Sequence, residues 1–258
     1  MRVINLGSGS KGNCTYIECG THHILIDIGF SYKETSRRLL EIGVNINQID
    51  TILVTHEHTD HIKGLREAIK HNKQIYVEKN CARVLGITNN INTHLITDQE
   101  FCIDEIYVQP YYLSHDSISC LGYKLSCGQA KVAFVTDTGF VPDGIITSLK
   151  DCKVVFIECN HDEEMLMNSS YPYMIKKRII SDIGHLSNSQ CAKVIIKLAY
   201  FGVVHFVLCH LSEQTNTKEI ACHTVAAEIN NAGLNINSDV IVRLTRQNGK
   251  SNNFIIGE

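Results

Sequence analysis

The chain has 258 residues, of which 44 % are hydrophobic, and a formal net charge of -3 at pH 7. This length is near the upper end of what one hydrophobic core serves, and no Gly/Ser/Pro-rich stretch marks a linker, so we predict a single domain, 1–258. No apolar run approaches the roughly 18 residues of a membrane span, and the N-terminus lacks the apolar core of a signal peptide, which predicts a cytoplasmic protein without membrane contact. The low net charge excludes a global basic surface, so any contact with nucleic acid needs a local patch.

Short β-branched apolar runs recur along the chain, and each stops at a residue that can bind a metal or carry a proton. In chain order the runs are HHILID ending at Asp27, TILVTH at His56, VQPYYLSH at His115, VAFVTD at Asp137, VVFIE at Glu158 and HFVLCH at His210. Runs of this length suit strands that are buried on both faces. We therefore expect their ends to cluster at one sheet edge.

Segments with helix start signals lie between these runs. One begins after Ser31, a second covers residues 62–70, and capping boxes predict two more, at Ser187 with Gln190 and at Asn216 with Glu219. Hairpins are predicted near both chain ends, with CGTHH and RQNG in their turns. Because strands and helices mix throughout, the fold class is α/β or α+β.

The stretch VTHEHTDHIKG, residues 54–64, carries three histidines and an aspartate within six positions. His56 and His58 are two residues apart, so both imidazoles can turn the same way and chelate one metal ion. Asp60 and His61 fall on the opposite side of such a turn and would suit a second ion. A role in a helix or in the core gives no reason for this clustering.

Four ligands cannot complete two metal sites, so further ligands are expected at other strand ends. His115, Asp137 and His210 fit this role, and Asp137 is the candidate bridge because a carboxylate can bind two cations. A single histidine at a strand end is more often a hydrogen-bonded structural residue, and only the run at residues 54–64 favours the metal interpretation here. We predict a dinuclear site.

Eight stretches, in the same order along the chain, resemble the metallo-β-lactamase superfamily, in its YycJ/WalJ-like branch of metallohydrolases and exonucleases. They are SGSKGNCTYIE, LIDIGFSYKE, VTHEHTDHIKGL, LSHDSISCLGYKL, VTDTG, IECNHDEEML, SYPYMIKKRIISDIGHLSN and CHLSEQTNT. The resemblance implies a four-layer αββα sandwich with the metal cleft at one edge of its two sheets. This fold agrees with strands that end in ligands.

The resemblance also implies a role for each ligand. The first metal would be held by His56, His58 and His115, the second by Asp60, His61 and His210, and both by Asp137. Asp27 would be a buried residue that organises the metal-binding loop.

A histidine that assists phosphate chemistry in similar tRNA-processing nucleases corresponds to His185 of GHLSN, and His161 of ECNHD competes for this role. We expect His185, steered by Glu158, to protonate the leaving oxygen, and Asp60 to orient the attacking water.

Two departures from other superfamily members narrow the chemistry. The best-known zinc β-lactamases have a cysteine where Asp137 stands and lack the histidine at His61, so antibiotic hydrolysis is disfavoured. Flavo-diiron members have a glutamate where His58 stands and an added flavin domain, so redox chemistry is disfavoured as well.

The leading hypothesis is a hydrolase with two divalent metal ions, zinc, manganese or iron, that cleaves phosphodiester bonds in nucleic acid. The resemblance implies a 5′ to 3′ exonuclease acting on DNA. The stretch YPYMIKKR places two aromatic residues beside three cations, a combination that stacks bases and holds phosphates: Tyr171, Tyr173, Lys176, Lys177 and Arg178. A solvated amphipathic helix would explain the same residues.

Two alternatives remain open. One is a small-molecule metallohydrolase that acts on a cyclic phosphodiester or a thioester, which the low net charge favours. The other is a non-catalytic regulatory protein with a structural metal, which seven ligands with an open coordination position disfavour.

Overall fold

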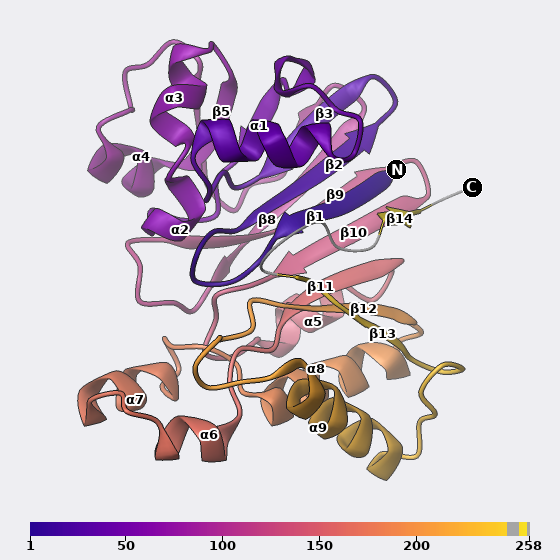
Figure 1. Cartoon of the computed structure of the whole chain (residues 1–258). Coiled ribbons are helices and arrows are strands. Elements are labelled where there is room, and N and C mark those ends of the chain that lie inside the picture. Colours follow the sequence, from indigo (N-terminus) through magenta and orange to yellow (C-terminus); the bar gives the residue numbers. More distant parts are fainter. Residues whose placement is uncertain (247–252, 257–258) are drawn as a thin grey trace. The chain divides into compact units, whose positions relative to one another are not determined.

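The computed structural model describes residues 1–246 and 253–256, and the chain divides into two compact units (Figure 1). Unit 1 comprises residues 1–112 and 117–121 together with the C-terminal residues from 245 on. Unit 2 comprises residues 113–116 and 122–244. Within the described residues, no helix is both long and apolar enough to cross a membrane.

Unit 1 contains a seven-stranded mixed sheet with the strand order β14-β1-β2-β3-β4-β5-β6. The strands are β1 (Arg2–Gly7), β2 (Cys14–Cys19), β3 (His22–Ile26), β4 (Thr51–Leu53), β5 (Gln74–Glu78), β6 (Thr93–Ile96) and β14 (Asn253–Ile255). The predicted first hairpin is confirmed, because β2 and β3 pair antiparallel across a short turn in which Gly20 has a φ of 59°. An antiparallel hairpin joins β7 (Phe101–Ile103) to β8 (Ile106–Leu113), two strands that do not belong to this sheet.

Helices cover one face of the sheet of unit 1. They are α1 (Tyr32–Leu40), α2 (Thr59–Ile62), α3 (Leu65–Lys70) and α4 (Lys79–Leu85), with a short 3₁₀ turn at Ile46–Gln48. Leu39 of α1, Leu65 of α3 and Cys81 of α4 join Leu25 and Ile52 of the strands in one buried cluster. Burial of this kind contributes about 25 cal/mol for each Å² of apolar surface removed from water, so packing on the sheet holds these short helices in place.

The segment 62–70 is not one helix as predicted, because the chain breaks between α2 and α3 at Gly64. The N–H of Gly64 donates to the carbonyl of Ile28 at 2.9 Å, and a Cβ at this position would lie 2.6 Å from the carbonyl oxygen of Phe30. The close approach of another backbone segment therefore requires glycine here and interrupts the helix.

Unit 2 contains the strand order β13-β12-β11-β10-β9, in which the first four strands run parallel and β9 pairs antiparallel with β10. The strands are β9 (Cys120–Cys127), β10 (Ala130–Val135), β11 (Val154–Glu158), β12 (His205–Cys209) and β13 (Ile241–Leu244). The helices are α5 (Asp143–Ser148), α6 (Glu163–Asn168), α7 (Tyr173–Ile179), α8 (Asn188–Tyr200) and α9 (Lys218–Asn231). In Figure 1, α8 and α9 lie beside each other next to β11 to β13.

Of the three predicted helix caps, two are confirmed. Ser31 caps α1, and Ser187 with Gln190 forms the capping box of α8. For α9 the N-cap is Thr217, whose side chain accepts from the N–H of Ile220 at 3.1 Å, and not Asn216. Asn216 is instead buried, and its amide donates to the carbonyls of residues 159 and 160.

The predicted C-terminal hairpin is wrong in its pairing. β13 pairs with β12, whereas β14 pairs with β1, so the two strands belong to different sheets. The turn residues 247–249 of the RQNG stretch lie outside the described residues.

The expectation that the ligand-bearing strands end at one sheet edge is wrong, because they belong to two sheets; within each unit, strand ends bring candidate site residues together. In unit 1, β3 and β4 are parallel neighbours, and Asp27 and His56 follow their carboxyl ends. In unit 2, β10, β11 and β12 are parallel neighbours that lead to Asp137, Glu158 and His210. Asp27, Asp137 and His210 have φ values of 60°, 60° and 56°, a backbone conformation that non-glycine residues rarely adopt and that clusters at functional sites.

Candidate metal centre

The histidine run of unit 1 lies at the end of β4 and in the first turn of α2. His56 is fully buried, and its ring centroid lies 4.6 Å from that of His58 and 4.1 Å from that of His61. His58 is the N-cap residue of α2, so the chain turns at this position. Asp60 and His61 stand in the single turn of α2, and Asp60 is partly exposed. Unit 1 therefore brings four of the seven predicted ligands together.

Asp27 organises this loop, as predicted. Its carboxylate accepts hydrogen bonds from the Thr55 N–H at 2.8 Å, from the Thr55 hydroxyl at 2.9 Å and from His61 Nδ1 at 2.7 Å. Burial raises the pKa of Asp27, and the contacts with His61 and Thr55 oppose that rise. Because His61 donates from Nδ1, Nε2 is the nitrogen with which it would bind a metal.

The Thr55 hydroxyl gives its one proton to Asp27, so it accepts from His56 Nδ1, which lies 3.0 Å away. Nε2 of His56 is then the nitrogen with which it would bind a metal. Asp27 and Thr55 together orient two imidazoles in the tautomer that a divalent cation requires.

The Gly-rich loop after β1 contacts the histidine run. The amide nitrogen of Asn13 lies 3.2 Å from the Asp60 carboxylate and 3.0 Å from His61 Nε2, and the Asn13 N–H donates to the Asp60 carbonyl at 2.7 Å. A Cβ on Gly29 would lie 1.7 Å from that same carbonyl oxygen, so the close approach of the loop requires glycine. Sequence reasoning missed Asn13, although the SGSKGN stretch carried a signal in its clustered glycines.

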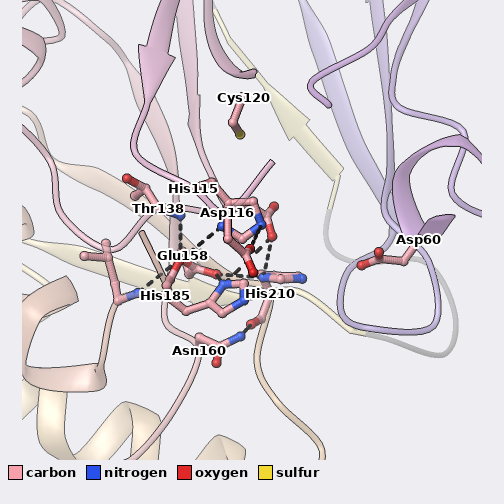
Figure 2. A network of polar contacts seen from close by, with 12 residues as sticks. Asp60, His115, Asp116, Cys120, Thr138, Glu158, Asn160, His185 and His210 are labelled. Carbon is pink, nitrogen blue, oxygen red and sulfur yellow. Dashed lines mark hydrogen bonds and ion pairs between the residues drawn. The ribbon is translucent and has the colours of Figure 1, made fainter. Parts of the chain in front are cut away.

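Glu158 is the centre of the site in unit 2 (Figure 2). It is fully buried, and its Oε1 accepts from His185 Nδ1 and from His210 Nδ1, each at 2.7 Å. Its Oε2 accepts from the backbone N–H of Thr138 at 3.0 Å and of Leu186 at 3.2 Å. Burial acts to raise the pKa of Glu158, but the charges and hydrogen bonds of His185 and His210 outweigh it and hold the pKa below its usual range. A carboxylate with four donors fixes both imidazoles through Nδ1.

The remaining ligands of unit 2 lie around this glutamate. His210 Nδ1 lies 3.2 Å from Asp137 Oδ1, and the ring centroids of His115 and His185 are 5.0 Å apart. Potential ligand atoms of Asp137, Glu158, His185 and His210 all lie within 4.8 Å of one another, a spacing that can hold a metal ion.

His115 is also held in the tautomer that suits a metal ligand. Its Nδ1 donates to the carbonyl of Gly184 at 3.2 Å, which leaves Nε2 on the opposite side of the ring. Burial lowers the pKa of His115, so the ring is neutral near pH 7. Neutral imidazoles and carboxylates are the donors that zinc, manganese and iron accept in proteins, so the residues of both units fit divalent metals.

Asp116, which sequence reasoning also missed, connects His115 to helix α7. One carboxylate oxygen lies 3.3 Å from His115 Nε2, and the other forms an ion pair of 2.6 Å with Arg178. The only signal in the sequence was its position directly after His115.

The predicted substrate residues lie at the start and on the surface of α7. Tyr171 is half-buried, whereas Tyr173 is 71 % exposed, and within α7 only Ile179 is buried. Lys176 donates to the carbonyl of Met167 at 2.6 Å. Among the described residues, no hydrogen bond or ion pair engages Lys177.

His161 is a buried histidine close to this site. Its side chain is almost fully buried, its Nδ1 has no hydrogen-bond partner among the described residues, and it forms a short parallel bridge with Ser187. Burial lowers the pKa of His161 to about 4. A ring that is neutral at pH 5 cannot act as the general acid near neutral pH, which favours His185 for that role.

We expect His161 to make the fold sensitive to acid. A histidine with a lowered pKa is neutral in the folded chain while its unfolded form takes up a proton, so stability is lost as pH falls below about 6.5 towards 4. Between pH 7.5 and pH 5 the free energy of unfolding of the wild type should fall by about 2 kcal/mol more than that of the variant His161→Gln. Urea unfolding of both proteins at the two pH values measures this difference, and equal pH dependence would contradict it.

Comparison with known proteins identifies the class. Residues 22–211 match the family model described as the beta-lactamase superfamily domain, which spans parts of both units. The crystal structure of the metallo-β-lactamase fold protein YhfI from Bacillus subtilis matches 97 % of this chain and 98 % of its own chain with a TM-score of 0.72, at 14 % identity, which shows the fold. The predicted αββα sandwich is confirmed, and the chain belongs to the metallo-β-lactamase superfamily.

Two relatives define its place within the superfamily. Exodeoxyribonuclease YycJ of Bacillus anthracis is 35 % identical over 244 residues, which cover 90 % of each chain. Exodeoxyribonuclease WalJ of Streptococcus pneumoniae serotype 2 (strain D39) is 32 % identical over 242 residues, which cover 91 % of this chain and 90 % of the relative. The predicted resemblance to the YycJ/WalJ branch is confirmed.

Proposed function

We propose that this chain is a metal-dependent exodeoxyribonuclease that cleaves phosphodiester bonds of DNA in the 5′ to 3′ direction. The similarity to YycJ, which extends over 90 % of both chains, carries this proposal. Two buried carboxylates support it, because Asp27 orients the imidazole of His61 in unit 1 and Glu158 orients that of His210 in unit 2, as metal ligands require. We further propose that residues 1–258 form one functional domain and that the protein works in the cytoplasm.

We infer that two divalent cations, zinc, manganese or iron, bind to the seven predicted ligands. His56, His58 and His115 would hold one cation, Asp60, His61 and His210 the other, and Asp137 both. When bound, the pair supplies a nucleophilic water at neutral pH and stabilises charge on the phosphate oxygens.

The other residues of the site have distinct tasks in this mechanism. Asp60 is partly exposed and held by Asn13, so its carboxylate orients the attacking water. His185 donates from Nδ1 to Glu158, so its Nε2 carries the proton that is delivered to the leaving oxygen.

DNA would lie against α7, because packing in the core does not explain the exposed side chains of this helix. Tyr173 and Met174 are 71 % and 70 % exposed, and Lys177 projects from the same short helix. Exposed aromatic rings stack on bases, and cations hold phosphates, so this helix suits a single strand. Arg178 is paired with Asp116, which makes Lys177 the cation best placed for a phosphate.

An activity panel tests the proposed function. The substrates are single-stranded and double-stranded DNA labelled at the 5′ or 3′ end, RNA, and bis-p-nitrophenyl phosphate, each assayed with zinc, manganese and iron. We expect mononucleotides to be released first from the 5′ end of DNA. Hydrolysis of the small diester or of a thioester without cleavage of DNA would instead favour the small-molecule hydrolase.

Replacing Lys177 with alanine should weaken binding of single-stranded DNA and reduce its dependence on salt. One lost phosphate contact lowers the slope of log K against log[salt] by about 0.7 for a single strand. Fluorescence anisotropy measures both effects when the salt concentration is varied from about 50 to about 300 mM. Hydrolysis of bis-p-nitrophenyl phosphate should not change, and Lys193→Ala, an exposed lysine of α8, is the control. An unchanged slope would remove Lys177 from the DNA surface.

A further inference from the structure

A groove in unit 1 lies next to the metal-binding loop and has no part in the mechanism. Its volume is about 300 Å³, and α2, α3 and α4 line it. Thr59 and Ile62 of α2 belong to the lining, so the groove borders the same helical turn that carries Asp60 and His61.

The floor of the groove is aliphatic. Ile62 and Ile69, together with Val84, Leu85 and Ile87, line it. Ile62, Ile69, Leu85 and Ile87 pack against the core cluster of unit 1 and are only partly buried, whereas Val84 is 58 % exposed, so the groove presents apolar surface that the core covers incompletely.

Two cations stand at the rim of the groove. Lys63 and Arg66 are both exposed, and within residues 1–246 and 253–256 neither has a hydrogen bond or an ion pair. By contrast, the nearby Lys70 pairs with Glu67. On a chain with a net charge of -3, this rim is a local positive surface without an internal partner.

We propose that this groove binds an acidic peptide segment of a partner protein, with a leucine, isoleucine or phenylalanine as its anchor. The apolar anchor fills the aliphatic floor, and neighbouring aspartates or glutamates pair with Lys63 and Arg66. Nucleobases fit less well because they stack on aromatic rings, and none of the lining residues is aromatic. The partner docks beside the turn that carries Asp60 and His61, without covering Asp27 or Thr55, which are buried.

Selection from random twelve-residue peptides displayed on phage tests the proposal, with the whole chain as bait and Lys63→Glu/Arg66→Glu as counter-selection. We expect enriched peptides to combine acidic residues with a large apolar residue. A selected peptide, labelled with fluorescein, should bind at least tenfold more weakly to Lys63→Glu/Arg66→Glu and to Val84→Glu. The matched control Lys33→Glu/Lys79→Glu changes the charge equally at two exposed lysines outside the groove and should bind like wild type.

Three outcomes would overturn the proposal. They are the absence of enrichment, enrichment of peptides without acidic residues, and equal binding by the groove and control variants. A ten-residue oligothymidylate that binds wild type and loses affinity with the groove variants would assign the groove to DNA instead. Thermal unfolding midpoints verify that each variant is folded, and the binding assay requires no nuclease activity, so a failure of the proposed function would leave this test intact.

Discussion

His58→Ala should lose metal and activity together, whereas His185→Ala should keep its metal and lose mainly turnover. His58 is a predicted ligand in the metal-binding loop, and removing the metal removes several kcal/mol of transition-state stabilisation, on the order of 10³-fold or more in rate. His185 acts on the leaving oxygen, and the loss of a general acid costs about 10² to 10⁴ in rate.

Metal analysis by atomic emission and kcat on labelled DNA measure the two effects. We expect two ions per chain in the wild type and in His185→Ala, and fewer in His58→Ala. The variant His223→Ala replaces an exposed histidine of α9 and should match the wild type in both measurements. Loss of metal in His185→Ala would show that His185 is a ligand and would place the final-ligand role of His210 in doubt.

Glu158→Gln should have the second large effect, because one side chain orients both His185 and His210. The carboxylate accepts two imidazole donors on Oε1 and two backbone donors on Oε2. Glutamine has a single acceptor oxygen, so its amide group must face either the two imidazoles or the two backbone N–H groups. Leaving donors unsatisfied in a fully buried position costs about 1 to 3 kcal/mol for each group.

We expect Glu158→Gln to lower metal affinity by about 10 to 100-fold and to lower kcat as well. Titration calorimetry with manganese and steady-state kinetics on DNA measure these effects, and urea unfolding shows how much stability is lost. Glu164→Gln, at an exposed position of α6, is the matched control. If Glu158→Gln lost stability but kept wild-type metal affinity and kcat, Glu158 would have only a structural role.

Much of the fold was predictable because it follows local rules. The strands that end near His56, Asp137 and His210 were visible as short β-branched runs, and Ser31 and Ser187 marked helix starts through capping bonds that span only three residues. The errors arose where distant backbone decided the outcome. Gly64 interrupts a predicted helix to meet residues 28 and 30, and β14 pairs with β1 instead of forming a hairpin with β13.

The sequence by itself determined the superfamily resemblance, the candidate ligands and the short strands that precede them, because motif spacing and β-branched apolar runs are local properties. Only the tertiary structure decided which atoms orient them. The bond between His210 and Glu158 joins residues 52 positions apart, and the contacts of Asn13 with Asp60 and of Arg178 with Asp116 span 47 and 62. A side chain's partner across such separations depends on how the strands and loops pack, and no local pattern in the sequence records it.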